Sequence, residues 1–155
     1  MERPLWKHAL YVLFEEVCLF LFGGVSYCLI EITWRGYTHW TMGVVGGFCF
    51  LGIGLLNNLI GWDMPLRVQM FCSAIIVTVT EFIAGVILNI WLGLNIWDYS
   101  NLPCNILGQV CLLYTFLWFI LSLPAIFMDD VIRWKIFKEE KPHYISQKIN
   151  PYRSI

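Results

Sequence analysis

Two long stretches of this sequence carry no charged residue, and they limit the possible folds more than any other feature. One covers twenty residues at 41–60 and the other thirty residues at 99–128. An α-helix rises 1.5 Å per residue, so about 20 apolar residues cross the roughly 30 Å hydrocarbon core of a bilayer. Helices in the core of a soluble protein seldom keep an uncharged sequence for so long. The two stretches therefore predict a membrane protein.

Apolar segments separated by turn signals predict four membrane-spanning helices, packed as an all-α integral membrane bundle. We expect them at residues 9–30, 41–60, 67–92 and 104–128, in a transmembrane domain of residues 1–128 followed by a cytoplasmic tail at residues 129–155. Pro65, a helix breaker, lies in the connection between the second and third helices. An acid in both odd-numbered helices and a Gly-x-x-Cys motif in both even-numbered helices indicate two tandem helical hairpins.

The distribution of Lys and Arg predicts which side of the membrane each end occupies. With four spans, both termini and the 61–67 connection share one side, and only Arg35 among the ten basic residues lies on the other. Since cytoplasmic segments carry the excess of Lys and Arg, both termini are expected in the cytoplasm of a multi-pass protein of the cell (inner) membrane. The nine basic residues on that side are Arg3, Lys7, Arg67, Arg133, Lys135, Lys138, Lys141, Lys148 and Arg153.

Small and polar residues recur at helical spacing along each apolar run. Gly43 and Gly47 form a Gly-x-x-x-Gly pair, which lets two membrane helices approach closely. The third run carries Ala74, Thr78, Glu81, Gly85 and Asn89 at spacings of three and four residues. If these stripes face one another, the bundle has a polar interior and an apolar exterior that contacts lipid.

Glu81 lies at the middle of the third run, where an acid is most costly. The aliphatic residues around it each favour insertion by about 0.3–0.6 kcal/mol and together outweigh a cost of about 3 kcal/mol for the acid. Ionisable residues inside a membrane span commonly mark a function. Glu81 is therefore a proton- or cation-coupled site or a contact for a polar substrate. Alternatively, it is a protonated carboxyl that joins helices by hydrogen bonds to Thr78, Asn89 or Gln109.

Other polar residues are further candidates for a substrate or ion pathway. Glu31 and Arg35 have the spacing and order of a helical ion pair, which either closes the end of the first helix or acts as a gate together with His39. Glu16 either faces the interior or pairs with Lys7 or Arg67 at the interface. The full set of pathway candidates is Glu16, Glu31, Arg35, Glu81, Asn89, Asp98, Asn105 and Gln109.

Charged residues in the first apolar run and after the fourth one lead to two further predictions. Glu15 and Glu16 interrupt the first apolar run, which is typical of a signal-anchor helix and not of a cleaved signal peptide. Mixed charges between Asp129 and Lys141 predict a solvated, salt-paired end of the fourth helix. The alternative for this charged segment is a docking surface for a soluble partner.

Several classes of function are disfavoured. The sequence has no basic stripe, so no nucleic-acid partner is expected. It contains no P-loop, Gly-x-Ser-x-Gly, His-Glu-x-x-His or Gly-x-Gly-x-x-Gly motif, so we expect neither an enzyme nor a bound cofactor or metal. A lipid-modifying enzyme built on Glu31, His39 and Asp98 is the least favoured hypothesis.

Several short segments, in order along the chain, carry a family resemblance. They are Arg35-Gly36-Tyr37-Thr38-His39-Trp40, Glu81-Phe82-Ile83-Ala84-Gly85, Trp97-Asp98-Tyr99-Ser100-Asn101-Leu102-Pro103 with Asn105 and Gly108-Gln109, and Glu139-Glu140-Lys141-Pro142-His143-Tyr144. They resemble the bacterial ABC transporter permease (ABC-transporter type IV) family, and the last segment resembles its small Firmicute-type members. That family more often continues Arg-Gly with a Leu-Tyr-Gly-Pro-type sequence, from which residues 37–40 depart.

The resemblance implies a bacterial inner-membrane permease that works with a separate ATPase and with further membrane subunits or as a homo-oligomer. The leading hypothesis is therefore a transport subunit in the lipid bilayer, with Glu81 as its intramembrane polar site and the 97–109 segment shaping the outer mouth. The alternative is a non-transporting structural or regulatory membrane protein, whose buried polar residues only hold the helices together.

Overall fold

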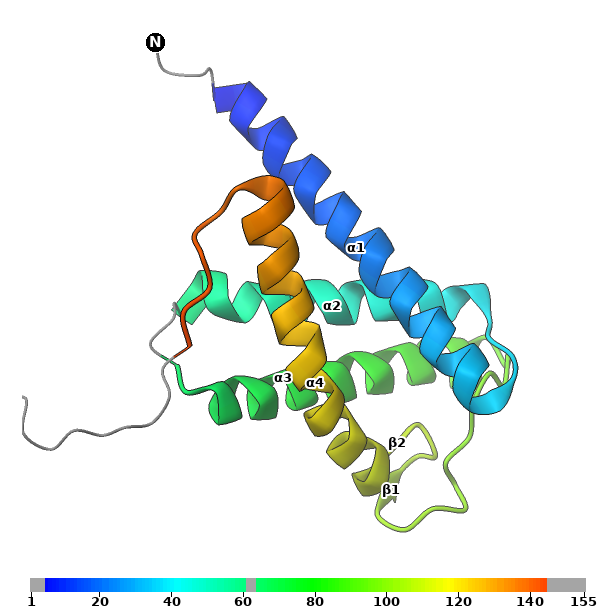
Figure 1. Cartoon of the computed structure of the whole chain (residues 1–155). Helices are drawn as coiled ribbons and strands as arrows, with labels where there is room; N and C mark the ends of the chain where they lie inside the picture. Colours follow the sequence, from blue (N-terminus) through cyan, green and yellow to red (C-terminus); the bar gives the residue numbers. More distant parts are fainter. Residues whose placement is uncertain (1–4, 61–63, 145–155) are drawn as a thin grey trace, which may run out of the picture.

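The computed structural model describes residues 5–60 and 64–144, and within them it is helical apart from one short hairpin (Figure 1). The hairpin consists of two antiparallel strands between the third and fourth α-helices. Two helices continue without interruption into a turn of π-helix. The elements are α1 (Leu5–Arg35), α2 (Trp40–Ile60), α3 (Leu66–Gly85) with the π-helix η1 (Val86–Trp91), β1 (Asn105–Ile106), β2 (Val110–Cys111), and α4 (Leu112–Ile132) with the π-helix η2 (Arg133–Phe137).

Three helical segments among the described residues are long and apolar enough to cross a bilayer. They are Leu5–Arg35, Leu66–Trp91 and Leu112–Phe137, while the apolar segment of α2, Trp40–Leu56, is shorter. Each π-helix lengthens the span of the α-helix before it. The predicted class, a helical membrane protein, agrees with these segments.

Burial in this molecule is the reverse of that in a soluble protein. Leu21, Phe71 and Phe116 are exposed on the outside of their helices, whereas Gln69 and Glu81 are buried. A soluble domain would place such side chains the other way round. The expected apolar exterior and polar interior are thus both present, as for helices surrounded by lipid.

The four helices form two layers in Figure 1. α2 and α3 run antiparallel beside each other, and α1 and α4 cross in front of them. The most extensive contact is between α1 and α2, followed by that between α3 and α4, so consecutive helices pair. The apolar core between the layers is formed by Val45, Cys49, Ile53, Val77 and Ile126.

Close approach of α1 and α2 depends on glycine. A Cβ atom added to Gly24 would lie 2.4 Å from the carbonyl oxygen of Gly43, closer than any real contact. The Gly43–Gly47 pair predicted to mediate close packing does so, since Gly47 lies against the ring of Phe20 one turn further along.

The fourth helix was expected from Cys104 and begins only at Leu112, so that boundary is wrong. Residues 104–111 form the β-hairpin instead. Cys104, Leu107 and Gly108 have φ angles of 54°, 52° and 68°, which no right-handed helix permits. The uncharged run of residues 99–128 is therefore part loop and part helix.

The other predicted ends also differ from the structure. α1 includes residues 5–8 and 31–35 beyond the expected 9–30, and the fourth helix continues past Met128 to Phe137 as α4 and η2. The expected boundary between membrane domain and tail at residue 128 is thus inside a helix. Residues 61–63 of the second connection, residues 145–155 of the tail, and the basic residues Arg3, Lys148 and Arg153 lie outside the described residues.

Candidate functional site

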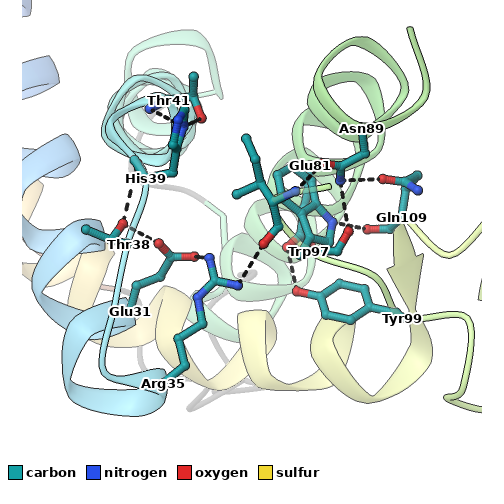
Figure 2. Close-up of polar contacts among 11 residues, drawn as sticks. Glu31, Arg35, Thr38, His39, Thr41, Glu81, Asn89, Trp97, Tyr99 and Gln109 are labelled. Carbon is teal, nitrogen blue, oxygen red and sulfur yellow. Dashed lines mark hydrogen bonds and ion pairs between the residues drawn. The ribbon is translucent and has the colours of Figure 1, made fainter. Parts of the chain in front are cut away.

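Glu81 lies four residues before the end of α3, within the apolar span Leu66–Trp91, and its side chain is in the interior, only 2% exposed. The hydroxyl of Tyr99 donates a hydrogen bond to Oε1 at 3.3 Å, and the indole N–H of Trp118 donates one to Oε2 at 2.9 Å. Each carboxylate oxygen therefore has one donor from a different element. Tyr99 belongs to the long loop (residues 92–111) and Trp118 belongs to α4. Figure 2 shows Tyr99 directed towards Glu81.

The partners expected for Glu81 are engaged elsewhere. The hydroxyl of Thr78 donates to Thr115 on α4 at 3.2 Å, and Asn89 bonds to Gln109. Asn89 is eight residues from Glu81, about 12 Å along a helix, which is too far for a hydrogen bond. The expectation that Thr78, Asn89 or Gln109 holds Glu81 is therefore wrong.

Both donors to Glu81 belong to stacked pairs of aromatic rings. Trp118 stacks on Tyr27 of α1 with ring centroids 5.8 Å apart, and Tyr99 stacks on Tyr114 with centroids 4.5 Å apart. Within residues 5–60 and 64–144, no Lys or Arg forms an ion pair with Glu81. The acid thus lies among aromatic rings and receives hydrogen bonds from neutral donors.

Asn89 holds the long loop against the end of the third helix. Its side-chain N–H groups donate to the carbonyl of Trp97 at 3.0 Å and to Oε1 of Gln109 at 2.8 Å, and its oxygen accepts from the backbone N–H of Ile96 at 2.7 Å. Trp97 closes the ring of contacts, because its indole N–H donates to the carbonyl of Gln109 at 2.9 Å (Figure 2). Asn89 lies in η1, and π-helical turns of this kind occur frequently at functional sites.

Gly85 makes room for this arrangement. A Cβ atom at residue 85 would lie 2.5 Å from Oε1 of Gln109. Since Asn89 lies four residues further along the helix, Gly85 and Asn89 share one face, and Gln109 packs across both. Gln109 therefore accounts for both residues, since it needs the space at Gly85 and accepts the hydrogen bond from Asn89.

Glu31 and Arg35 form the predicted ion pair at the end of α1. The carboxylate of Glu31 accepts hydrogen bonds from the guanidinium of Arg35 and from the hydroxyl of Thr38 (Figure 2). Arg35 also donates to the carbonyl of Ile96 at 3.3 Å, so α1 is tied to the same loop that Asn89 holds. His39 does not join the pair but contacts the hydroxyl of Thr41, 2.8 Å away, at the start of α2.

Asp98 and Asn105 shape the long loop from within. The hydroxyl of Ser100 at 2.5 Å and its backbone N–H at 2.8 Å both donate to Asp98, and these bonds hold the pKa of this exposed carboxyl below its usual range. Asn105 donates to the carbonyl of Leu102 at 2.8 Å and accepts from the N–H of Gly108. Neither side chain contacts Glu81.

Glu16 lies at the opposite end of the molecule, in a group of charges that we call the Arg133 cluster (Glu15, Glu16, Asp129 and Arg133). The Arg133 guanidinium lies 2.9 Å from Asp129, 3.2 Å from Glu15 and 3.1 Å from Glu16. Fifteen residues of helix, about 22 Å, separate Glu16 from Glu31. Glu16 therefore does not share a site with the other candidates.

The Arg133 cluster contradicts the expected solvated end of the fourth helix. Asp129, Asp130 and Arg133 are buried, and Glu16 pairs with Arg133 and not with Lys7 or Arg67. The cause is the direction of α4, which brings its end back across the first half of α1. There the hydroxyl of Tyr11 also donates to the carbonyl of Phe137 at 2.8 Å. The spacing of Asp129 and Arg133 was the only local signal of this cluster.

Long apolar helices, an apolar outer surface and a buried polar interior define a helical membrane protein. The sequence matches the model of the family described as "Putative ABC-transporter type IV" over residues 18–147, which is most of the chain. The chain belongs to this family, as its motifs had indicated. The matched region includes every candidate residue except Glu16. No curated protein and no solved structure matches the chain.

Proposed function

We propose that this chain is the membrane-embedded permease subunit of an ABC-type transporter, with Glu81 contacting the transported solute or ion. One observation carries the proposal: a carboxylate is buried at the middle of a span that is long and apolar enough to cross a bilayer. An ionisable group at that depth is costly to keep, and such groups commonly line a transport pathway. Family membership supports the same assignment.

The proposed topology has all four helices across the inner membrane of a bacterial cell and both chain ends in the cytoplasm. The excess of Lys and Arg on one side supports this orientation. The start of α1 and the end of η2 lie together, as the contact between Tyr11 and Phe137 indicates, which supports an even number of spans.

The proposal assigns no catalytic step to this chain. Its sequence has no phosphate-binding loop, so ATP hydrolysis belongs to a separate soluble subunit. Four helices enclose little space for a solute, and we therefore include a second membrane subunit or a second copy of the chain in the working transporter. The long loop, held by Arg35, Asn89 and Gln109, forms the outer mouth.

Co-purification tests the permease assignment. The tagged full chain is crosslinked in cells, extracted in mild detergent and purified, and the bound proteins are identified by mass spectrometry. We expect an ATPase subunit in near-equal amount, and we expect it to be retained by Glu81→Gln because that change lies far from the soluble side. If no ATPase is recovered with crosslinking, the permease assignment is overturned.

A second candidate function is a non-transporting structural or regulatory membrane protein. The observation that favours it is that the side-chain amides of Asn89 and Gln109 hydrogen-bond to protein atoms and thereby hold the long loop. This candidate predicts the opposite co-purification result, with other membrane proteins recovered and no ATPase.

A further inference from the structure

A cleft of about 330 Å³ lies between α1 and α4, with residues of α2 and α3 also in its wall. Leu29 and Ile30 of α1 and Met128 of α4 line it and are exposed. The cleft therefore opens on the apolar surface that faces lipid. Most of its wall is apolar, formed among others by Phe22, Phe50, Ile53 and Leu121.

One end of the cleft lies against the Glu81 site. Tyr27 and Trp118, the stacked pair beside Glu81, are both part of the wall. The indole N–H of Trp118 donates to the Glu81 carboxylate at 2.9 Å, so Glu81 adjoins the wall at Trp118 although it does not itself line the cleft. The cleft is thus apolar along its length and aromatic at one end, where Trp118 connects its wall to the Glu81 carboxylate.

Glu81 differs from the buried acids Glu15 and Asp129 in forming no ion pair with a Lys or Arg among the described residues. Glu31 faces the guanidinium of Arg35, and Glu15 and Asp129 face that of Arg133. The two donors of Glu81 are neutral, so the carboxylate, when ionised, has no paired cation among the described residues. In a medium of low dielectric constant an uncompensated charge attracts a mobile cation strongly.

We propose that this cleft binds an organic cation, with the apolar body of the ligand between α1 and α4 and its positive charge beside Tyr27 and Trp118, the tryptophan that contacts Glu81. Aromatic side chains attract such cations, and the nearby carboxylate adds a favourable charge. A metal ion or a proton leaves the apolar part of the cleft unfilled. The inference rests on the proposed function and names its substrate class.

Binding of tetraphenylphosphonium to the purified full chain in nanodiscs tests the proposal. Tetraphenylborate is the matched probe, because it has nearly the same shape and the opposite charge. By equilibrium dialysis against empty nanodiscs, we expect saturable binding of the cation and none of the anion. Glu81→Gln should weaken cation binding about tenfold or more, since it removes the charge and keeps the size. Glu140→Gln, a change at an exposed acid, should leave it unaltered.

A second variant tests the location without touching the acid. Ala125 lines the cleft, and Ala125→Phe fills part of it, so cation binding should be lost while helix content by circular dichroism stays normal. Equal binding of both probes, or binding unaffected by either Glu81→Gln or Ala125→Phe, overturns the proposal. If an ATPase co-purifies but the cation does not bind, the permease assignment stands and the organic-cation cleft alone is wrong.

Discussion

Arg133 and Glu81 represent two ways of keeping a charge inside this bundle. Arg133 is surrounded by carboxylates from α1 and from its own helix, all within 3.2 Å. Glu81 receives hydrogen bonds from two aromatic side chains and has no ion pair within the described residues. The first arrangement joins α1 to the end of the fourth helix by ion pairs, and the second joins α3 to α4 and to the long loop by hydrogen bonds alone.

Removing the Arg133 side chain should destabilise the fold. Arg133→Met leaves Glu15 and Asp129 buried without a counter-charge, which typically costs about 3–5 kcal/mol. The expected result is a clearly lower midpoint of thermal unfolding in detergent, followed by circular dichroism. Arg67→Met is the matched control, because Arg67 is exposed. Equal midpoints for the two variants would show that the Arg133 cluster does not stabilise the fold.

At the level of the helices, the contact between α1 and α2 leaves no room for a larger side chain at Gly24. The backbone of Gly24 touches that of Gly43, so any side chain at residue 24 pushes the helices apart. The two residues stand on stripes of small residues that face each other. Membrane helices gain their association energy from such close packing, since lipid supplies no hydrophobic drive.

Gly24→Val should therefore weaken the pairing of α1 and α2. Overpacking of a close contact costs about 1–3 kcal/mol, and here the clash is with backbone. We expect a lower unfolding midpoint and faster proteolysis of the 36–39 connection. Ala9→Val adds a larger side chain to an exposed position of the same helix and serves as control. An unchanged protease pattern for Gly24→Val would contradict the close-contact argument.

At the scale of the whole molecule, the reversed burial explains why so small a chain is full of polar contacts. The lipid that surrounds the helices offers no hydrogen-bond partners, so buried polar groups bond to one another between elements of the fold. The Thr78–Thr115 pair joins α3 to α4, and the Asn89–Gln109 pair joins η1 to the long loop. The polar interior therefore holds the bundle together.

Reporter fusions test the four-span topology, and α2 is the decisive helix because its apolar segment is the shortest. Green fluorescent protein fused after Pro65 or Ile155 should fluoresce, as it does only in the cytoplasm. Alkaline phosphatase fused after Gly36 or Leu102 should be active, because this enzyme is active only outside the cytoplasm. If phosphatase is active after both Gly36 and Pro65, α2 does not cross the membrane and the orientation of α3 and α4 is reversed.

The membrane class, the four helical segments, the stripe that turns Glu81 inwards and the ion pair of Glu31 with Arg35 were all predictable from the order of amino acids. These features are set by helix geometry over a few residues, which the order of amino acids encodes directly. The bonds of Trp118 to Glu81 and of Arg133 to Glu15, across 37 and 118 residues, were not predictable in this way and are visible only in the folded molecule. Such partners depend on how helices cross and in which register, and the same stripes permit many crossings.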